Sequence, residues 1–305
     1  MHVRILGSAA GGGLPQWNCG CPNCQAARTS GRNRTQSSVA VSADGERWVL
    51  LNTSPDIRQQ LSGYSALWPR AARHSRVAAV VLTDAEIDHT LGLMLLREAT
   101  HPLRVYAPAG VIGLLTREWP LFTVLGAYCG VSACALSDRA RIALEDSSGR
   151  STGLWCTAVP MSRRAPRYAR ERPAESWEVG LRIENRAEPG GAVLAYIPAA
   201  GCIDDAVERV AGDADLLLID GTFWSDDELA RASGQEGGVT ARAMGHLPLG
   251  DPDGSLTALG KLTAKRTVLV HINNTNPILD AGSPERARLE GAGLVVGEDG
   301  MEFEL

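Results

Sequence analysis

The sequence of 305 residues lacks several features that would assign it to common classes of protein. No apolar run approaches the ~18 residues of a membrane-spanning helix, so we expect no membrane segment. Positive charge is not in excess, because 30 Lys and Arg stand against 35 Asp and Glu. A net charge of −5 argues against general attraction to nucleic acid or anionic membranes. We find no internal repeat. The first residues are too short and too Gly-rich for a signal peptide, so we expect no secretory leader and a cytoplasmic protein.

What is present is typical of a globular chain. Hydrophobic residues make up 44% and charged residues 21%, which argues against disorder. Apolar runs at 77–82, 216–219 and 267–270 predict strands, and helices are predicted at 55–61, after a Ser54 cap, and at 91–99. The segment 136–160 is rich in predicted strands, and a last hairpin is predicted at 294–296 and 301–305. This order favours an α/β protein with two packed sheets and helices outside.

Polar side chains follow three of these strands at their C-terminal ends, where open α/β sheets bind ligands. They are Asp84, Glu86, Asp88, His89, Asp220 and His271. If the three strands are neighbours in one sheet, these side chains converge. Two histidines and a carboxylate suit non-haem Fe(II), and further oxygen ligands suit Mn or Mg. Each residue taken alone also fits a plainer interpretation, with Asp88 as a helix cap and His271 as a core histidine. His246, in a Gly-rich loop, is either a surface histidine or a substrate contact that supplies a proton.

Seven cysteines are present, and three of them are clustered. Cys19, Cys21 and Cys24 lie in a loop at about 17–25, where closely spaced thiolates can hold one structural zinc ion. The fourth ligand must come from elsewhere. The remaining cysteines are predicted to be small buried residues, with a local bridge between the first two left open: Cys129, Cys134, Cys156 and Cys202.

The segment 163–172 is rich in arginine. It is interpreted as a solvated loop or lid. A role in facing the substrate is the alternative, since loops carry many binding residues.

Six runs of the sequence resemble the coenzyme PQQ synthesis protein B family. They are NCGCPNC at 18–24, LNTSPDIRQQ at 51–60, TDAEIDHTLGL at 83–93, DGTFW at 220–224, GHLP at 245–248 and HINNTNP at 271–277. The resemblance spans nearly the whole chain. It implies the metallo-β-lactamase fold, a four-layer αββα sandwich, as a single domain over residues 1–305.

The resemblance also implies which metal ligands remain. Hydrolases of this superfamily share a His-X-His-X-Asp-His loop, and in this chain Asp84 and Glu86 stand in place of its first two histidines. A middle-strand histidine is missing, and Ala199 stands where the hydrolases have a metal-bridging aspartate. The ligand set that this leaves is Asp88, His89 and His271, which suits one metal ion rather than two.

Proteins of the resembled family are associated with oxidation of a Glu-Tyr unit cut from the precursor peptide PqqA, on the way to pyrroloquinoline quinone (PQQ). The resemblance therefore implies an Fe(II)-dependent hydroxylase that uses O₂. The catalytic or substrate-binding residues would be Asp84, Glu86, Asp220 and His246. The cysteine loop resembles the structural zinc loop of phosphodiesterases, in which a histidine at the position of Asn274 completes the site. An asparagine oxygen is a poor zinc ligand, so the fourth ligand stays open.

Two other functions are kept as alternatives. The first is a metal-dependent hydrolase resembling phosphodiesterases. The second is a carrier or transport protein for the finished cofactor, whose three carboxylates the arginine-rich segment would bind. Other proteins of the pathway and a second copy of the chain are considered as partners.

Overall fold

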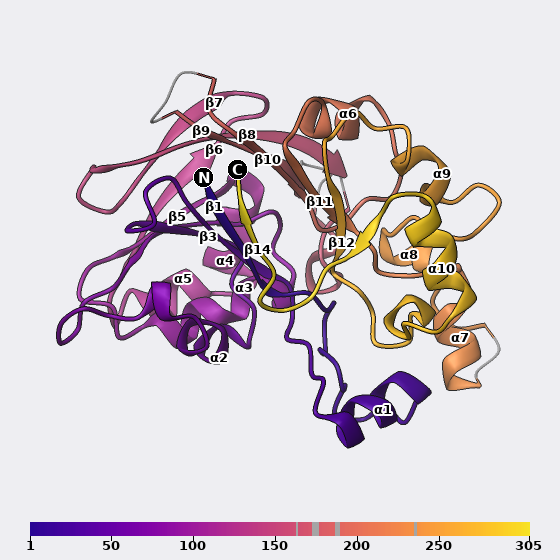
Figure 1. The fold of residues 1–305 in the computed structure, drawn as a ribbon. Coiled ribbons are helices and arrows are strands. Elements are labelled where there is room, and N and C mark those ends of the chain that lie inside the picture. The colour runs from indigo at the N-terminus through magenta and orange to yellow at the C-terminus, as the bar shows by residue number, and fades with distance from the viewer. Residues whose placement is uncertain (163, 173–176, 187–189, 235–236) are drawn as a thin grey trace.

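Two mixed seven-stranded sheets form the centre of the protein (Figure 1). The computed structural model describes residues 1–162, 164–172, 177–186, 190–234 and 237–305. The first sheet contains, in spatial order, β14 (Glu302–Glu304), β1 (His2–Gly7), β2 (Ser38–Ser42), β3 (Trp48–Leu51), β4 (Val77–Val81), β5 (Leu103–Pro108) and β6 (Val131–Leu136). The second contains β13 (Val295–Val296), β12 (Thr267–Val270), β11 (Leu216–Asp220), β10 (Val193–Ile197), β9 (Glu178–Asn185), β8 (Ser151–Ser162) and β7 (Arg141–Glu145).

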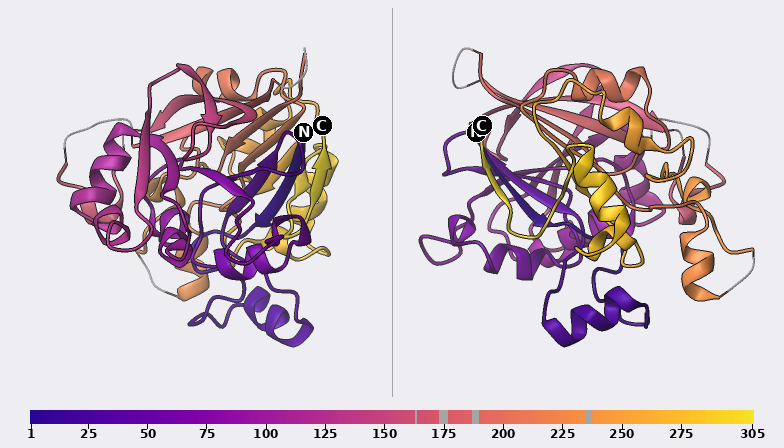
Figure 2. Two further views of the ribbon diagram at one scale, coloured as in Figure 1. Left: turned by 90° about the vertical axis from the view of Figure 1, so that its left-hand side faces the viewer. Right: turned by 45° about the vertical axis from the view of Figure 1, so that its right-hand side comes forward.

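The sheets pack face to face, and their facing side chains form one buried apolar cluster. Helical segments cover the outer face of the first sheet: α2 (Ile57–Ser62), η1 (Ser65–Leu67), η2 (Leu91–Leu96), α4 (Ala109–Arg117) and α5 (Leu121–Leu125). Others cover the outer face of the second sheet: α6 (Asp205–Ala211), α9 (Ser255–Leu259), η4 (Pro277–Leu279) and α10 (Pro284–Gly291). Figure 2 shows these layers from two sides. The predicted four-layer αββα arrangement is confirmed.

The remaining short helices lie in loops: α1 (Pro22–Ser30), α3 (Ile87–Thr90), η3 (Arg167–Ala169), α7 (Glu228–Ser233) and α8 (Ala241–Met244). The first of them, α1, projects away from the sandwich (Figure 1). Among the described residues, no helix combines the length and the apolar character needed to cross a membrane.

The strands that precede the predicted site residues belong to different sheets. β4 lies in the first sheet, whereas β11 and β12 are parallel neighbours in the second. The assumption that all three strands share one sheet is therefore wrong. Their loops still meet, because the C-terminal ends of the parallel strands lie on the same side of the sandwich.

The predicted C-terminal hairpin is also wrong. β13 pairs with β12 in the second sheet, whereas β14 pairs with β1 in the first. The connection crosses between the sheets because backbone hydrogen bonds hold it to both. Gly297 N–H donates to the carbonyl of Leu269, and Gly300 N–H donates to the carbonyl of Ile5.

Instead of the α-helix predicted at 91–99, the chain forms the 3₁₀ segment η2 (Leu91–Leu96), which directly follows α3. Gly92 packs directly against the loop after β3, where its N–H donates to the Thr53 carbonyl. A Cβ at this position would lie 2.2 Å from the Ser54 carbonyl oxygen, so only glycine allows the approach. Helix α2 begins at Ile57 rather than at residue 55. The Ser54 hydroxyl still accepts from the N–H of Asp56, as a cap would, and also donates to the side chain of Gln60.

Candidate metal centre

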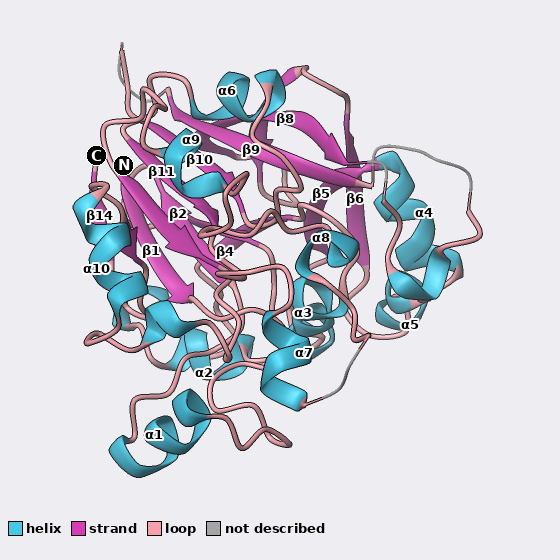
Figure 3. Ribbon diagram, turned by 90° about the vertical axis from the view of Figure 1, so that its right-hand side faces the viewer, coloured by secondary structure: helices cyan, strands magenta, loops and turns pink. Residues whose placement is uncertain are grey.

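Loops from both sheets bring the predicted polar residues together at one edge of the sandwich. Continuous side-chain contacts join Asp84, Asp88, His89, Asp220, His246 and His271. The short helices α3 and α8 lie at this edge (Figure 3). The convergence expected from the sequence is therefore observed, although it occurs between the sheets rather than along one of them.

Asp88, His89 and His271 form the first candidate metal site, with one ligand atom from each within 4.8 Å of the others. Asp88 Oδ2 lies 3.3 Å from His271 Nε2 and 3.8 Å from His89 Nε2. His89 Nε2 is buried and has no hydrogen-bond partner in the described part of the chain. A buried polar nitrogen without a partner costs about 1–3 kcal/mol, and a metal ion would satisfy it. The residues present therefore fit a metal ion.

Asp84 lies behind His89 rather than among these ligand atoms. Its two carboxylate oxygens lie 2.7 and 2.9 Å from His89 Nδ1. The Thr83 hydroxyl and the backbone N–H of Glu86 both donate to the same carboxylate and hold it in place. A carboxylate behind a ligating histidine fixes the tautomer of the ring and directs Nε2 to the metal. Asp84 is thus placed to orient His89.

The charges at this site oppose the effect of burial. Burial by itself lowers the pKa of His89, but the carboxylates of Asp84 and Asp88 raise it to about 10. Burial by itself would raise the pKa of Asp88, but the nearby His89 and His271 lower this pKa to well below its usual range. The pKa of His271 is lowered, first by burial. Asp88 is therefore ionised and His271 is neutral, as metal ligands must be.

Asp220, His246 and His271 form a second candidate metal site, which shares His271 with the first. Asp220 Oδ2 lies 2.7 Å from His246 Nδ1, and the two histidine rings stack with centroids 5.2 Å apart. The Thr222 hydroxyl lies 2.6 Å from Asp220 Oδ1 and 2.8 Å from His271 Nδ1. These contacts orient His271 so that its Nε2 faces Asp88. Thr222 belongs to a motif that the sequence singled out, but no role was predicted for it.

Glu178 is a site residue that the sequence reasoning missed. Its Oε1 is buried and lacks a hydrogen-bond partner among the described residues. Burial, followed by the charge of Asp84, raises its pKa to about 8. The next residue, Val179, donates its N–H to the carbonyl of Thr83, which ties the start of β9 to the loop after β4. No local motif marks Glu178, because only the packing of β9 against the opposite sheet brings it here.

Glu86 is the remaining predicted residue of this cluster. Burial and then the charges of Asp84 and Asp88 raise the pKa of its carboxyl to about 7. Glu86 and Glu178 are therefore groups that can hold or release a proton near neutral pH.

The glycine-rich loop after β1 also approaches the site. A Cβ at Gly11 would lie 3.2 Å from Asp88 Oδ2, so the missing side chain leaves room for the carboxylate. His271 has φ +57°, a left-handed conformation that is rare for a residue with a Cβ. Backbone hydrogen bonds hold the chain there, since its carbonyl accepts from Thr222 Oγ1 and the next N–H donates to Ser8.

The three clustered cysteines converge on Asn274. Asn274 Nδ2 lies 3.1 Å from the Sγ of Cys19, 3.6 Å from that of Cys21 and 3.3 Å from that of Cys24. Rotation of the amide would place its oxygen at the same point, since the two amide atoms have nearly the same shape. The position expected for a fourth ligand is therefore filled by Asn274, three residues after His271, so one loop links the cysteine cluster to the first candidate metal site.

All four scattered cysteines are free, including the pair for which a bridge was left open. Cys156 is buried, as predicted for each of them. Cys202 is exposed, and Cys129 and Cys134 are half-buried, so the prediction of burial is wrong for Cys202 and incomplete for the other two.

Replacing Cys21 with serine is expected to remove about one zinc ion per chain, because serine is a much weaker ligand than a thiolate. The metal content expected for the site of Asp88, His89 and His271 should not change. Metal analysis of the purified variant measures this directly. Cys202→Ser is the matched control, because Cys202 lies outside the cluster. An unchanged zinc content in Cys21→Ser would contradict a zinc site in this loop.

Known proteins match the chain along its length. A β-lactamase superfamily domain matches residues 47–272. The chain is 46% identical to coenzyme PQQ synthesis protein B of Cupriavidus necator, with 99% of each chain covered, and 45% identical to that of Methylococcus capsulatus, with each chain covered fully. The chain belongs to the coenzyme PQQ synthesis protein B family.

A solved structure supports the same assignment. Zn²⁺-bound PqqB from Methylobacterium extorquens is 39% identical, covers all of both chains and superposes with a TM-score of 0.87. The metallo-β-lactamase fold that the resemblance implied is thus confirmed for this PqqB family member. The bound Zn²⁺ is a property of that relative, and it agrees with the metal-binding character of the residues described above.

Proposed function

We propose that the protein acts in PQQ biosynthesis as an Fe(II)-dependent oxygenase that hydroxylates the tyrosine ring of a Glu-Tyr intermediate derived from PqqA. The observation that carries the proposal is the set of Asp88, His89 and His271, with a buried His89 Nε2 that lacks a partner among the described residues. Two histidines and one carboxylate are the ligand set of many non-haem iron oxygenases. Such a set leaves coordination positions open for O₂ and substrate.

When bound, the iron would supply O₂ activation. The surrounding residues would orient the metal ligands and exchange protons with the substrate. Asp84 holds the His89 ring in one orientation, and Thr222 does the same for His271. Glu86 and Glu178, whose pKa values are raised to about 7 and about 8, can exchange a proton with a phenol or an amine of the substrate. Asp220 and His246 stay paired with each other and line the same edge.

The proposal is tested by loading the protein with Fe(II) without oxygen, adding the dipeptide Glu-Tyr and then admitting O₂. Insertion of one oxygen atom into a ring C–H bond, with reduction of the other to water, needs two electrons and two protons. Ascorbate supplies the electrons in this assay. Mass spectrometry should show a product that is heavier by one oxygen atom, and ¹⁸O₂ should label it. Unchanged dipeptide with fully iron-loaded protein would refute the proposal for this substrate.

A second candidate function is metal-dependent hydrolysis. It is favoured by one observation, the second candidate site of Asp220, His246 and His271, because two neighbouring ions are typical of hydrolases. Zn²⁺-loaded protein releasing p-nitrophenol from a phosphodiester, together with two metal ions at this edge, would support it. One metal ion and no release would leave the oxygenase as the better explanation.

A further inference from the structure

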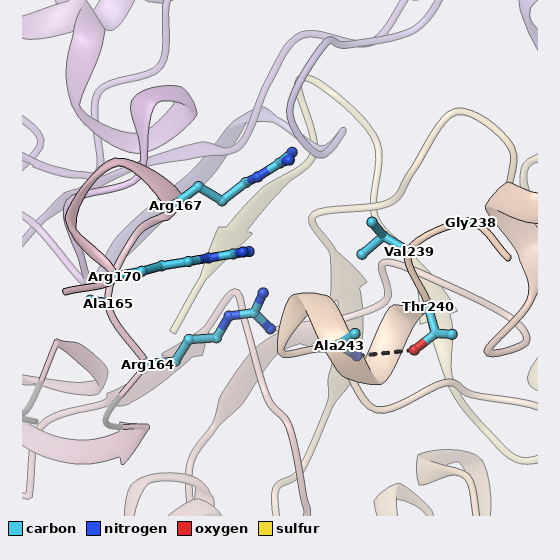
Figure 4. Close-up of a pocket in the computed structure, with 8 residues that line it drawn as sticks. All are labelled: Arg164, Ala165, Arg167, Arg170, Gly238, Val239, Thr240 and Ala243. Carbon is cyan, nitrogen blue, oxygen red and sulfur yellow. Dashed lines mark hydrogen bonds between the residues drawn. The ribbon is translucent and has the colours of Figure 1, made fainter.

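A cavity of about 770 Å³ lies between the arginine-rich segment and the residues before His246. Arg164, Arg167 and Arg170 line one side, and residues 238–240 with Ala243 line the other. Figure 4 shows the three arginine side chains extending in the same direction, toward the facing segment. Arg163, part of the segment singled out in the sequence, lies outside the described residues.

The three arginines lie at every third position of one segment, and Arg167 begins η3. The segment is anchored to the core, because Ala165 and Ala169 are buried in the cluster beneath the first sheet. The Tyr168 hydroxyl also donates to the Ala85 carbonyl at 2.7 Å. The arginines are therefore presented by an anchored segment rather than by a free loop.

Across the described ranges, none of these three guanidinium groups makes a hydrogen bond or lies within 4.0 Å of a carboxylate, whereas the neighbouring Arg172 pairs with Glu118. Arg164 is half-buried, and the other two are exposed. Three neighbouring positive charges repel one another, and an anion placed among them would remove this repulsion.

Three observations place the cavity beside the metal centre. Tyr168 holds the carbonyl of Ala85, which lies between Asp84 and Glu86 in the loop after β4. Arg164 lies close enough to Glu86 and Glu178 for their charges to act on it. On the other side, a Cβ at Gly245, the residue before His246, would lie 3.4 Å from Arg164 Nη1. The cavity therefore lies beside the loops that carry the candidate metal ligands.

We propose that this cavity binds the carboxylate groups of a small polycarboxylate whose other end reaches the metal centre. The guanidinium group matches a carboxylate with two parallel hydrogen bonds, which favours this partner. The acidic residues around the metal would repel the same carboxylates, so the arginines provide the binding that those residues cannot. That the bound molecule is also the one that reacts at the metal depends on the oxygenase function proposed above.

The test is calorimetric binding of Glu-Tyr, which carries two carboxylates, to Zn²⁺-loaded protein under conditions that allow no turnover. The double variant Arg167→Gln/Arg170→Gln should bind Glu-Tyr at least tenfold more weakly than the unmodified protein. Arg172→Gln is the matched control, because Arg172 belongs to the same segment but already pairs with Glu118. It should bind within twofold of the unmodified protein. Gln-Tyr-amide, which lacks both carboxylates, should bind weakly to every variant.

Equal binding of Glu-Tyr to the double variant and the unmodified protein would overturn the proposal. Inorganic phosphate that binds as tightly as Glu-Tyr, and in the same arginine-dependent way, would overturn the assignment to carboxylates. Unchanged metal content and thermal midpoint are the check on folding, and both are expected because Arg167 and Arg170 are exposed. Hydroxylation by iron-loaded protein is measured separately. Arginine-dependent binding without product would contradict only the oxygenase function. Product formation, with binding that the arginine substitutions leave unchanged, would contradict only the cavity proposal.

Discussion

Replacing His89 with alanine is expected to empty the site formed by Asp88, His89 and His271 and to abolish activity there. The substitution removes one of three ligands and leaves the charge of Asp88 without its closest cationic partner. Changes to groups behind a ligand already cost about 10–100-fold in metal affinity, so loss of the ligand itself should cost more. Zinc in the cysteine loop should stay, because none of its ligands belongs to this triad.

Metal analysis after anaerobic purification measures this outcome. His101→Ala is the control, because His101 is exposed and belongs to neither candidate metal site. That variant should keep both ions. If His89→Ala retains the same metal content as the unmodified protein, the triad is not the metal site. Two zinc ions in the unmodified protein, one of them lost from the variant, would support the hydrolase instead.

Metal binding at this site is expected to tighten as the pH rises. The pKa of His89 is raised to about 10 in the metal-free protein, mainly by the carboxylates that oppose its burial. His89 therefore carries a second proton at neutral pH, and a metal ion at Nε2 must displace it. Asp88 is ionised and His271 is neutral there, so one proton is released. Affinity should rise about tenfold for each pH unit between about pH 6 and 9.

Asp84→Asn tests the cause of this dependence. The variant loses the first of the charges that raise the pKa of His89, so the dependence on pH should become flatter. Its metal affinity at high pH should fall about 10–100-fold, because Asp84 no longer fixes the ring. Competitive Zn²⁺ titration with a chelator gives both quantities, and Asp205→Asn, at an exposed position, serves as the control. An affinity independent of pH in the unmodified protein would contradict a protonated His89.

The secondary structure shows where local patterns suffice and where they fail. The apolar run at 77–82 predicts β4 correctly, because strand formation there needs only short-range β propensity and burial on both faces. The same reasoning fails for 91–99 because Gly92 packs against Ser54, a contact between separate parts of the chain. The prediction of a C-terminal hairpin is wrong for a similar reason, because the backbone N–H groups of Gly297 and Gly300 donate to strands of different sheets.

The cysteine site and the first candidate metal site differ in how much of each was accessible from the sequence. Cys19, Cys21 and Cys24 lie within one loop, so their spacing alone brings them together. Asp88 and His89 are likewise adjacent. His271, in contrast, comes from the opposite sheet, and its place beside Asp88 depends on the packing of the sandwich.

The sequence by itself therefore determined the strands, the cysteine cluster and the polar loops that end the strands, because short-range propensities and spacing govern each of them. Tertiary structure alone decided that Asp84 lies behind His89, that Thr222 orients His271 and that Glu178 reaches the centre. It also placed three arginines along one cavity beside the metal ligands. These relations depend on which strands pair and which sheet each strand joins, and contacts between distant residues set that pairing.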